Sequence, residues 1–276
     1  MKRGYEQPAA AINSRLQYII LSSGGGANDF GDLTEGALTA LGMTSNNTRG
    51  LLYGGANPDY VSSFSQINLQ SLGANSSFGN TFDFIPIRNA AGASNGTRAV
   101  FAGGDNADGN VFTIVFVLIA SGGSPDKFGD LNDDLSGHDA VDSAVRGCFG
   151  GGKAPGVVNT IDFITIATEG NATDFGNLTQ VKFGPAGAGS KTRAVFMAGG
   201  TPSRLSEIDF VTFSSTGNAA DFGNMTVARA AGGMAGHSSE TRALLAAGST
   251  PSSDQNDTID FITIASTGDG VDFGNL

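Results

Sequence analysis

Six of the Phe-Gly dipeptides in the chain follow one another at nearly constant spacing. Their phenylalanines follow one another at steps of 48, 50, 47, 47 and 51 residues, and they are Phe30, Phe78, Phe128, Phe175, Phe222 and Phe273. A fixed period of roughly 20–50 residues is typical of folds that repeat one supersecondary unit. This period constrains the fold more than any other feature of the sequence.

Two further elements recur with the same period, and both predict strands. An Arg begins a short segment that ends in glycine, as in residues 48–55 (Thr-Arg-Gly-Leu-Leu-Tyr-Gly-Gly). The copies of this residue are Arg49, Arg98, Arg146, Arg193 and Arg242, with Arg3 as a degenerate sixth. A second segment alternates apolar and polar residues, most clearly in residues 161–166, 208–213 and 259–264. Alternation with a period of two indicates a strand. The copy at 114–119 lacks the polar positions, which indicates burial on both faces or contact with a partner.

The composition supports a fold made of strands and turns. The chain has 42 Gly among 276 residues, and glycine costs about 1 kcal/mol relative to Ala inside a helix. Each repeat of about 47 residues supplies four strands: a glycine-rich inner strand, the Arg-headed strand, the alternating strand and a strand leading into Phe-Gly. We therefore predict an all-β fold, a six-bladed β-propeller with four-stranded antiparallel blades, forming one domain over residues 1–276.

The ends of the chain leave the closure of this propeller open. Residues 1–34 supply an Arg-headed strand, an alternating strand and a Phe-Gly strand, and Leu276 lies where the next inner strand should begin. A closed ring of six blades would therefore lack one inner strand. Either the last blade has three strands or the chain is a piece of a longer one, and the sequence is compatible with both.

The repeat resembles the kelch family. Kelch blades place a glycine pair after the second strand and often a basic residue before the next inner strand. The matching pairs are Gly54-Gly55, Gly103-Gly104, Gly151-Gly152 and Gly199-Gly200, and the matching basic residues are Arg88, Lys182 and Arg229. The chain departs from the family where the kelch Trp is replaced by the Phe of Phe-Gly. The variant with Thr-Arg-Gly, Ile-Asp-Phe-Ile-Thr-Ile and Asp-Phe-Gly-Asn-Leu is similar to repeats in structural proteins of marine bacteriophages.

The repeated residues favour structural roles. A residue needed once per blade recurs, whereas a binding site usually breaks the symmetry. We expect the arginines to act as struts, paired with nearby Asp or stacked on Phe; a ring of guanidiniums that binds an acidic glycan is the alternative. We expect the Phe of Phe-Gly to lie in the core and the preceding Asp to cap a turn. Cys148, the single cysteine, is expected to be a small buried residue.

Charge and residue counts argue against several functional classes. The net charge is −11 and the five Lys are scattered, so we expect no nucleic-acid partner. No apolar run reaches the roughly 18 residues of a membrane span, so we expect no membrane insertion. The two histidines, His138 and His237, are interpreted as loop residues in related positions of two repeats. Asp105 and Asp108 are weak candidates for a Ca²⁺ site, with a plain turn favoured. We expect no cofactor and no enzymatic activity.

The resemblance to repeats of marine phage structural proteins implies a non-enzymatic structural or adhesion module on the outer surface of a phage virion, such as a tail fibre used in host attachment. Its expected partners are other virion proteins or a host-surface glycan. A glycan-active propeller enzyme and a cellular kelch-type interaction module are the alternatives. The repeats diverge most in the loops after the glycine pairs and in the third repeat, and such loops commonly carry function. We therefore expect residues 105–142 to contribute disproportionately to any protein or glycan contact. The candidate partner-binding residues are Asp130, Asp133, Asp134, Asp139 and Asp142.

Overall fold

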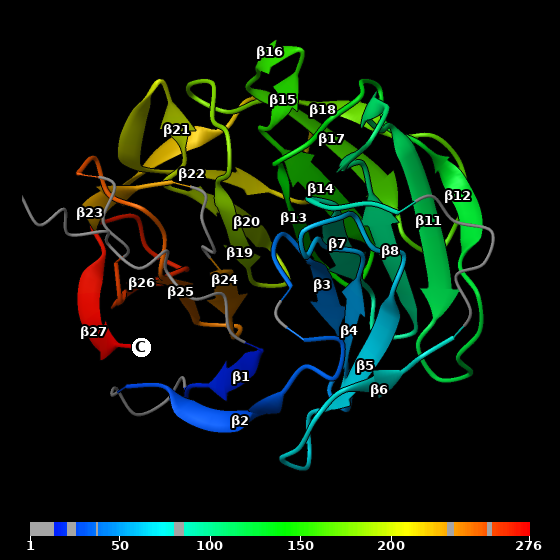
Figure 1. The fold of residues 1–276 in the computed structure, drawn as a ribbon. Coiled ribbons are helices and arrows are strands. Elements are labelled where there is room, and N and C mark those ends of the chain that lie inside the picture. Colours follow the sequence, from blue (N-terminus) through cyan, green and yellow to red (C-terminus); the bar gives the residue numbers. More distant parts are fainter. Residues whose placement is uncertain (1–13, 21–25, 37, 80–85, 231–234, 253–255) are drawn as a thin grey trace, which may run out of the picture.

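The structure is a computed structural model that describes residues 14–20, 26–36, 38–79, 86–230, 235–252 and 256–276. The described residues contain no α-helix. Their strands form antiparallel sheets that radiate from a common centre, which is the arrangement of a β-propeller (Figure 1). The all-β prediction and the four-stranded blades are confirmed.

Five sheets have the full four-stranded path, each hydrogen-bonded in the order inner, second, third, outer. The first blade is β3 (Gly42–Ser45), β4 (Arg49–Tyr53), β5 (Phe64–Asn68) and β6 (Ser76–Ser77). The second is β7 (Ala91–Ser94), β8 (Arg98–Ala102), β11 (Thr113–Leu118) and β12 (Asp126–Asp130). The third is β13 (Asp139–Asp142), β14 (Arg146–Gly150), β17 (Thr160–Thr165) and β18 (Thr173–Asn177). The fourth is β19 (Ala186–Gly189), β20 (Arg193–Met197), β22 (Ser203–Thr212) and β23 (Ala220–Arg229). The fifth is β24 (Ala235–Ser238), β25 (Arg242–Ala246), β26 (Thr258–Thr263) and β27 (Val271–Asn275).

The prediction of six blades is wrong, because the first repeat contributes only two described strands. They are β1 (Arg15–Tyr18) and β2 (Asn28–Asp32), a two-stranded sheet that corresponds to the third and outer strands of a blade. Arg3 lies outside the described residues. The propeller therefore has five four-stranded blades and one two-stranded sheet.

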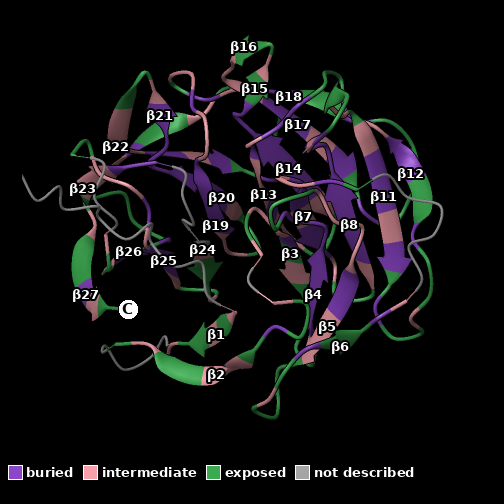
Figure 2. Cartoon of the chain, in the orientation of Figure 1, coloured by how far each residue is buried: buried purple, intermediate pink, exposed green. Residues whose placement is uncertain are grey.

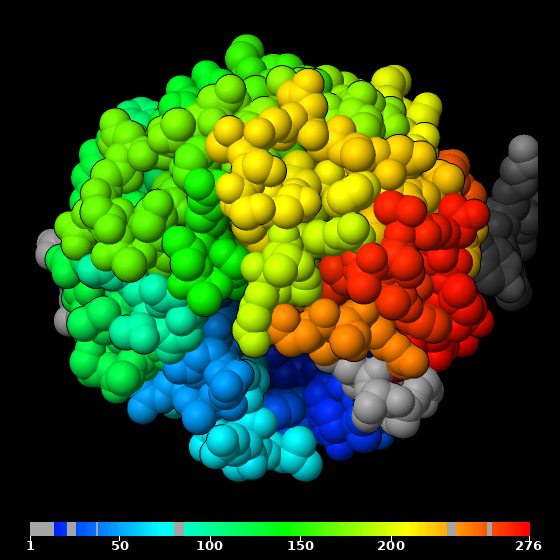
Figure 3. Space-filling model, turned by 180° about the vertical axis from the view of Figure 1, so that it is seen from behind, coloured from blue at the N-terminus to red at the C-terminus, as the bar shows by residue number. Residues whose placement is uncertain are grey.

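The two-stranded sheet lies between the last blade and the first (Figure 1). Ala27 N–H donates to the carbonyl of Asn275 at 3.2 Å, and Gly73 N–H donates to the carbonyl of Phe30 at 2.9 Å. Figure 3 shows the opposite face, where the blue N-terminal segment lies beside the orange C-terminal segment. The seam predicted at the chain ends is thus bridged at the periphery by β1 and β2.

The inner strands approach each other closely because their residues are small. A Cβ on Gly92 would lie 2.3 Å from the carbonyl oxygen of Met43 in the preceding blade, and one on Gly236 would lie 2.0 Å from that of Gly187. Both distances are far below a van der Waals contact. The alternating segments form the third strand of each blade, outside these inner strands, as predicted.

Both faces of a central blade are covered by its neighbours, so the period-two pattern does not mark a solvent face (Figure 2). Ile161, Asp162 and Ile164 in β17 are all buried. The equivalent aspartates Asp209 and Asp260 are fully buried as well. Strand β11, which lacks polar positions, is covered on both faces, with Ile114 fully buried and Val115 nearly so.

The phenylalanines of Phe-Gly pack edge-on against an aromatic ring of the third strand in every unit. Phe175 meets Phe163 with ring centroids 5.7 Å apart and an interplanar angle of 86°. The other pairs are Tyr18–Phe30, Phe64–Phe78, Phe116–Phe128, Phe210–Phe222 and Phe261–Phe273. Phe30 is half-buried, and the other five are buried. The edge-to-face geometry adds a favourable interaction between the rings to the free energy gained by burying their apolar surface.

The glycine of Phe-Gly forms a backbone contact with the turn that precedes the outer strand of the next blade. Phe128 accepts a hydrogen bond from the N–H of Gly170 at 2.9 Å. A Cβ on Gly129 would lie 2.1 Å from the carbonyl oxygen of Gly170, so no other residue fits there. The same contact joins Gly31 to Gly73, Gly79 to Gly123, Gly176 to Gly217 and Gly223 to Gly268.

The glycine pair after the second strand has left-handed backbone angles, for example φ of 67° at Gly54 and 105° at Gly55. In the fourth blade these angles fall on Ala198 (58°) and Gly199 (103°). The predicted pair Gly199-Gly200 is therefore one residue out of register, and Gly200 begins β21 (Gly200–Thr201).

The basic position before the inner strand also needs correction. The second residue of each glycine pair donates its N–H to one carbonyl of the following linker, and these carbonyls belong to Ile87, Leu135, Lys182 and Arg229. Arg88 is one residue beyond the equivalent position. It lies at the surface, whereas Lys182 and Arg229 are fully buried.

Candidate functional site

The repeated arginines are engaged within the fold. Arg146 stacks on Phe163 of its own blade at 4.6 Å, and its Nη1 donates to the carbonyl of Phe213 in the next blade at 2.6 Å. Arg193 stacks on Phe210 and donates to Ile264 in the same way. Arg49 donates to Ile119, Arg98 to Ile166, and Arg242 stacks on Phe261. All five are half-buried. This is the geometry of a strut between blades, with backbone carbonyls in place of the expected Asp partners.

The aspartate before Phe-Gly caps its turn in three blades. Asp174 Oδ1 accepts the N–H of Gly176 at 3.1 Å, and Asp221 and Asp272 accept from Gly223 and Gly274 at the same distance. Side-chain carboxylates commonly close such turns by bonding the backbone two residues on. The Arg and Asp residues that recur in the repeats therefore make contacts that stabilise the fold.

The five clustered aspartates separate into three places. Asp139 and Asp142 lie on the inner strand β13 and accept backbone N–H groups of both neighbouring inner strands: Asp139 from Gly187 at 2.6 Å and Asp142 from Ser94 at 2.9 Å. Burial raises the pKa of each carboxyl to about 6. Through these hydrogen bonds the two residues connect three blades.

Asp130 ends the outer strand β12, where its Oδ2 lies 3.0 Å from the ammonium of the exposed Lys127. Only Asp133 and Asp134 remain together, exposed in the linker that enters the third blade. The sequence placed these five residues in one group because they are close along the chain. The fold separates them because a strand and a linker project their side chains in different directions.

The loops between the second and third strands share a face with the linkers between blades. In the second blade this loop is the hairpin β9 (Asp105–Asn106) and β10 (Gly109–Asn110), and in the third it is β15 (Lys153–Ala154) and β16 (Gly156–Val157). Isolated bridges tie each loop to its linker, as between Arg88 and Asp105 and between Ser136 and Lys153. We call this side of the propeller the loop face.

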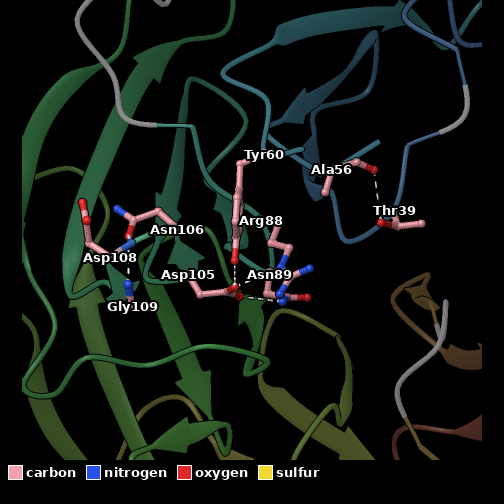
Figure 4. Close-up of polar contacts among 9 residues, drawn as sticks. All are labelled: Thr39, Ala56, Tyr60, Arg88, Asn89, Asp105, Asn106, Asp108 and Gly109. Carbon is pink, nitrogen blue, oxygen red and sulfur yellow. Dashed lines mark hydrogen bonds and ion pairs between the residues drawn. The ribbon is translucent and has the colours of Figure 1, made fainter. Parts of the chain in front are cut away.

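Asp105, a candidate Ca²⁺ ligand, is surrounded by hydrogen-bond donors (Figure 4). Its Oδ2 accepts from the hydroxyl of Tyr60 at 3.0 Å and from Nε of Arg88 at 2.9 Å, and its Oδ1 accepts from Asn89 at 2.7 Å. Arg88 also stacks on the ring of Tyr60 at 4.8 Å. The carboxylate raises the pKa of Arg88, chiefly through this hydrogen bond. These groups neutralise Asp105 and join the first two blades.

Asp108 lies apart from this cluster at the tip of the hairpin. Its backbone N–H bonds the side chain of Asn106 at 2.9 Å, which is the geometry of a plain turn. Within the described ranges, no group of three or more His, Cys, Asp or Glu is placed to hold a metal ion.

An open polar cavity of about 470 Å³ lies on the loop face between the second and third blades. It is lined by Asn110 of the second blade's hairpin, by Asp133 and Asp134, and by Lys153, Ala154 and Pro155 of the third blade's hairpin. Among the described residues, neither carboxylate lining this cavity, nor the ammonium of Lys153, has a hydrogen bond or ion pair with the protein. The cavity therefore presents charged groups of both signs that are solvated and not engaged by the rest of the protein.

The walls of the cavity are tied to one another. The side-chain amide of Asn110 donates to the carbonyl of Lys153 at 2.7 Å and to that of Asp134 at 3.2 Å. Asn132 bonds the buried Asp162 through both its backbone N–H, at 3.0 Å, and its side chain, at 2.7 Å. Burial raises the pKa of Asp162. A pocket held by such contacts is formed before any ligand arrives.

Phe112 is a residue of this region that the sequence analysis missed. Its ring is 46% exposed, and its carbonyl accepts the N–H of Leu131 at 2.7 Å, which places it beside the linker of Asp133 and Asp134. When the repeats are aligned on the pairing of their third strands, the equivalent residues are Ser14, Ser62, Asn159, Ser206 and Asp257. Aligning the repeats on the third strand would have found this single aromatic departure.

The histidines do not occupy related positions. His138 is buried before β13, with its ring 6.1 Å from that of Phe149, and burial lowers its pKa to about 4. His237 lies within the inner strand β24 and is exposed. Cys148 is fully buried in β14, as expected, and burial raises the pKa of its thiol to about 12.

No protein-family model matches the chain, and no curated protein matches it. No helix in the described part of the chain has the length and apolar character needed to cross a membrane.

Proposed function

We propose that the chain is a non-enzymatic binding module of a phage virion, displayed on the particle surface, that contacts another virion protein or a host-surface glycan. The observation that carries this proposal is the polar cavity between the second and third blades. It is the place where unpaired polar side chains converge while the symmetric residues are engaged in the fold. Loops on a rigid scaffold are the usual location of such contacts.

The assignment to a kelch-type propeller belongs to the same proposal. It is supported by the left-handed glycine pair after the second strand, as at Gly103 and Gly104 with φ of 62° and 105°. The buried basic residues Lys182 and Arg229 before the inner strands support it as well. The phage origin rests on the similarity of the repeat to those of marine phage structural proteins, and the localisation on the virion follows from that similarity.

A glycan-cleaving activity is the second candidate, because Asp133 and Asp134 converge in one asymmetric cavity. A general acid must stay protonated near neutral pH, and burial is the common means of achieving this. Both carboxylates are exposed, which favours binding over cleavage. Incubating the chain with the glycans it binds and measuring new reducing ends distinguishes the two, since a binding module releases none.

Immunogold labelling tests the virion assignment. An antibody raised against the recombinant chain should decorate intact phage particles purified from a source that encodes it. Labelling confined to host cells without phage would instead support the cellular interaction module. Cross-linking of the decorated particles then identifies the contacting residues, which we expect within 105–155 on the loop face. A footprint limited to the regular fourth and fifth blades would contradict the proposed site.

A further inference from the structure

Phe112 is an exposed aromatic residue whose backbone lies next to the linker that lines the polar cavity. Phe112 lies two residues after the cavity-lining Asn110 and is hydrogen-bonded through its carbonyl to the linker that carries Asp133 and Asp134. Its equivalents in the other repeats are Ser, Asn or Asp, so the fold does not need an aromatic residue there. An exposed aromatic ring that the fold does not require is a common anchor for a ligand.

From this juxtaposition we infer that the cavity is a carbohydrate subsite, which takes one uncharged or amino-substituted pyranose residue with its C–H face against Phe112. This inference rests on the proposed binding function and specifies its ligand. A pyranose has an apolar face of C–H groups and a rim of hydroxyls that both donate and accept hydrogen bonds. Phe112 fits the face, while Asp133, Asp134 and Lys153 fit the rim.

The chemistry of the rim selects among sugars. The two carboxylates accept hydrogen bonds only, so they fit hydroxyl or ammonium groups, which donate. Lys153 donates only and fits a hydroxyl, ring or acetamido oxygen. A sugar carboxylate or sulfate would meet two negative charges against one positive charge in the cavity. The net charge of −11 on the whole chain adds to this repulsion, which acts as a specificity device against acidic glycans.

The backbone that carries the side chains of the cavity is held in place by hydrogen bonds within the protein. Asn110 holds the carbonyls of Asp134 and Lys153, and Asn132 is fixed to the buried Asp162. The binding groups therefore stand on backbone that is already ordered, which reduces the entropy lost when a ligand binds. The charged side chains remain in solvent, so each single contact is weak, and a repeated presentation on a particle would supply avidity.

A glycan array probed with the labelled intact chain tests this inference. We expect signal on neutral and amino-sugar glycans and none on sialylated, uronate-containing or sulfated ones. The Phe112→Ser variant, which installs the residue of the equivalent Ser62 and Ser206, should weaken binding by about tenfold. The double variant Asp133→Asn and Asp134→Asn should also weaken it and should relax the exclusion of acidic glycans. Leu72→Ser, at an exposed apolar residue of the first blade, and Asp126→Asn, on the outer strand β12, are the matched controls and should bind as the parent does.

The possible results distinguish failure of the proposed sugar ligand from failure of the proposed virion function. Thermal unfolding of each variant first verifies that it is folded, since Phe112, Asp133 and Asp134 are exposed and their replacement should leave the melting temperature unchanged. Binding confined to acidic glycans, or binding unaffected by Phe112→Ser, overturns the subsite. Absence of glycan binding together with decoration of phage particles overturns the sugar ligand and leaves the proposed virion function in place. Absence of both overturns both.

Discussion

Arg146 of the third blade donates a hydrogen bond of 2.6 Å to the backbone carbonyl of Phe213 in the fourth blade, while its guanidinium stacks on Phe163. One side chain thus joins two sheets that share no hydrogen-bonded strand. A guanidinium is suited to this role because its planar group stacks on a ring and donates at its edge at the same time. The fold therefore explains why this arginine recurs in the repeats. We expect ligand binding from residues that differ between the repeats.

The first prediction concerns this strut. Arg146→Gln should lower the free energy of unfolding by about 2 kcal/mol, because it removes a charge-assisted hydrogen bond and a cation–π contact. Urea denaturation measures the change. Lys127→Gln, at an exposed cation on the outer strand β12, is the control and should change stability by less than about 0.5 kcal/mol. Equal stability of the Arg146→Gln variant and the parent would mean that the guanidinium is not a strut.

The second prediction concerns the contact between the outer strand β12 and the turn that precedes the outer strand β18. Gly129→Ala would place a Cβ 2.1 Å from the carbonyl oxygen of Gly170, so the second and third blades must separate locally. We expect a loss of about 2–3 kcal/mol, as for other overpacked sites. Gly156→Ala is the control, because a Cβ there meets no atom within 4 Å. A Gly129→Ala variant with the parent's melting temperature would refute the close approach of Gly129 to the turn at Gly170.

Much of the fold was predictable because its contacts repeat. The Phe-Gly period located the outer strands, and the Arg-headed and alternating segments located the second and third strands, since each has a pattern that sheet geometry imposes. The number of blades was not predictable from the number of Phe-Gly copies. Phe30 belongs to a repeat that contributes only β1 and β2 to the described structure.

The candidate site was predicted only in part, because repeats are recognised by the residues that their copies share, whereas the site consists of residues that differ between copies. Asp133 and Asp134 were identified, but Asp139 and Asp142 were grouped with them by position in the sequence, although the inner strand turns them toward neighbouring blades. Phe112 was missed because it differs from the Ser, Asn or Asp that the other repeats have at the equivalent position. Arg88 was matched to the wrong position because it is basic, whereas the feature that recurs in the linkers is a backbone carbonyl, which here belongs to Ile87.

The third prediction compares two ways in which blades fill one buried position. In the fourth blade Lys182 pairs with Asp209 at 3.0 Å, both fully buried, while the second blade has Ile87 and Val115 at the equivalent positions. Lys182→Ile alone should cost about 3–5 kcal/mol, because it leaves the carboxylate of Asp209 buried without a cation. The double variant Lys182→Ile and Asp209→Val should recover most of this loss. A double-mutant cycle by urea denaturation measures the coupling, and additive losses would show that the two side chains do not interact.

The fourth prediction is a pH dependence that arises at the inner strand β13. Burial raises the pKa of Asp142 to about 6, above its usual value near 3.9. The folded state therefore holds this proton more tightly than the unfolded state, and the associated stability is complete below about pH 4 and is lost as the pH rises through 6. Asp142→Asn keeps an oxygen that can accept the N–H of Ser94 and stays neutral at every pH. Relative to the parent, this variant should gain about 1–2 kcal/mol of stability between pH 4.5 and pH 8, since partial exposure reduces the full effect.

This comparison with the parent is needed because other groups titrate in the same range. Asp139, with its pKa also raised to about 6, acts in the same direction as Asp142. His138 acts in the opposite direction: its pKa is lowered to about 4, so its contribution is complete above about pH 6.5 and is lost as the pH falls toward 4. Both contributions are present in the parent and in the Asp142→Asn variant, and they cancel in the difference between the two unfolding curves. The difference should therefore rise once, with a midpoint between pH 4 and 6. A difference that is the same at pH 4.5 and at pH 8 would show that the carboxyl of Asp142 is solvated like an ordinary surface group and does not carry a burial penalty.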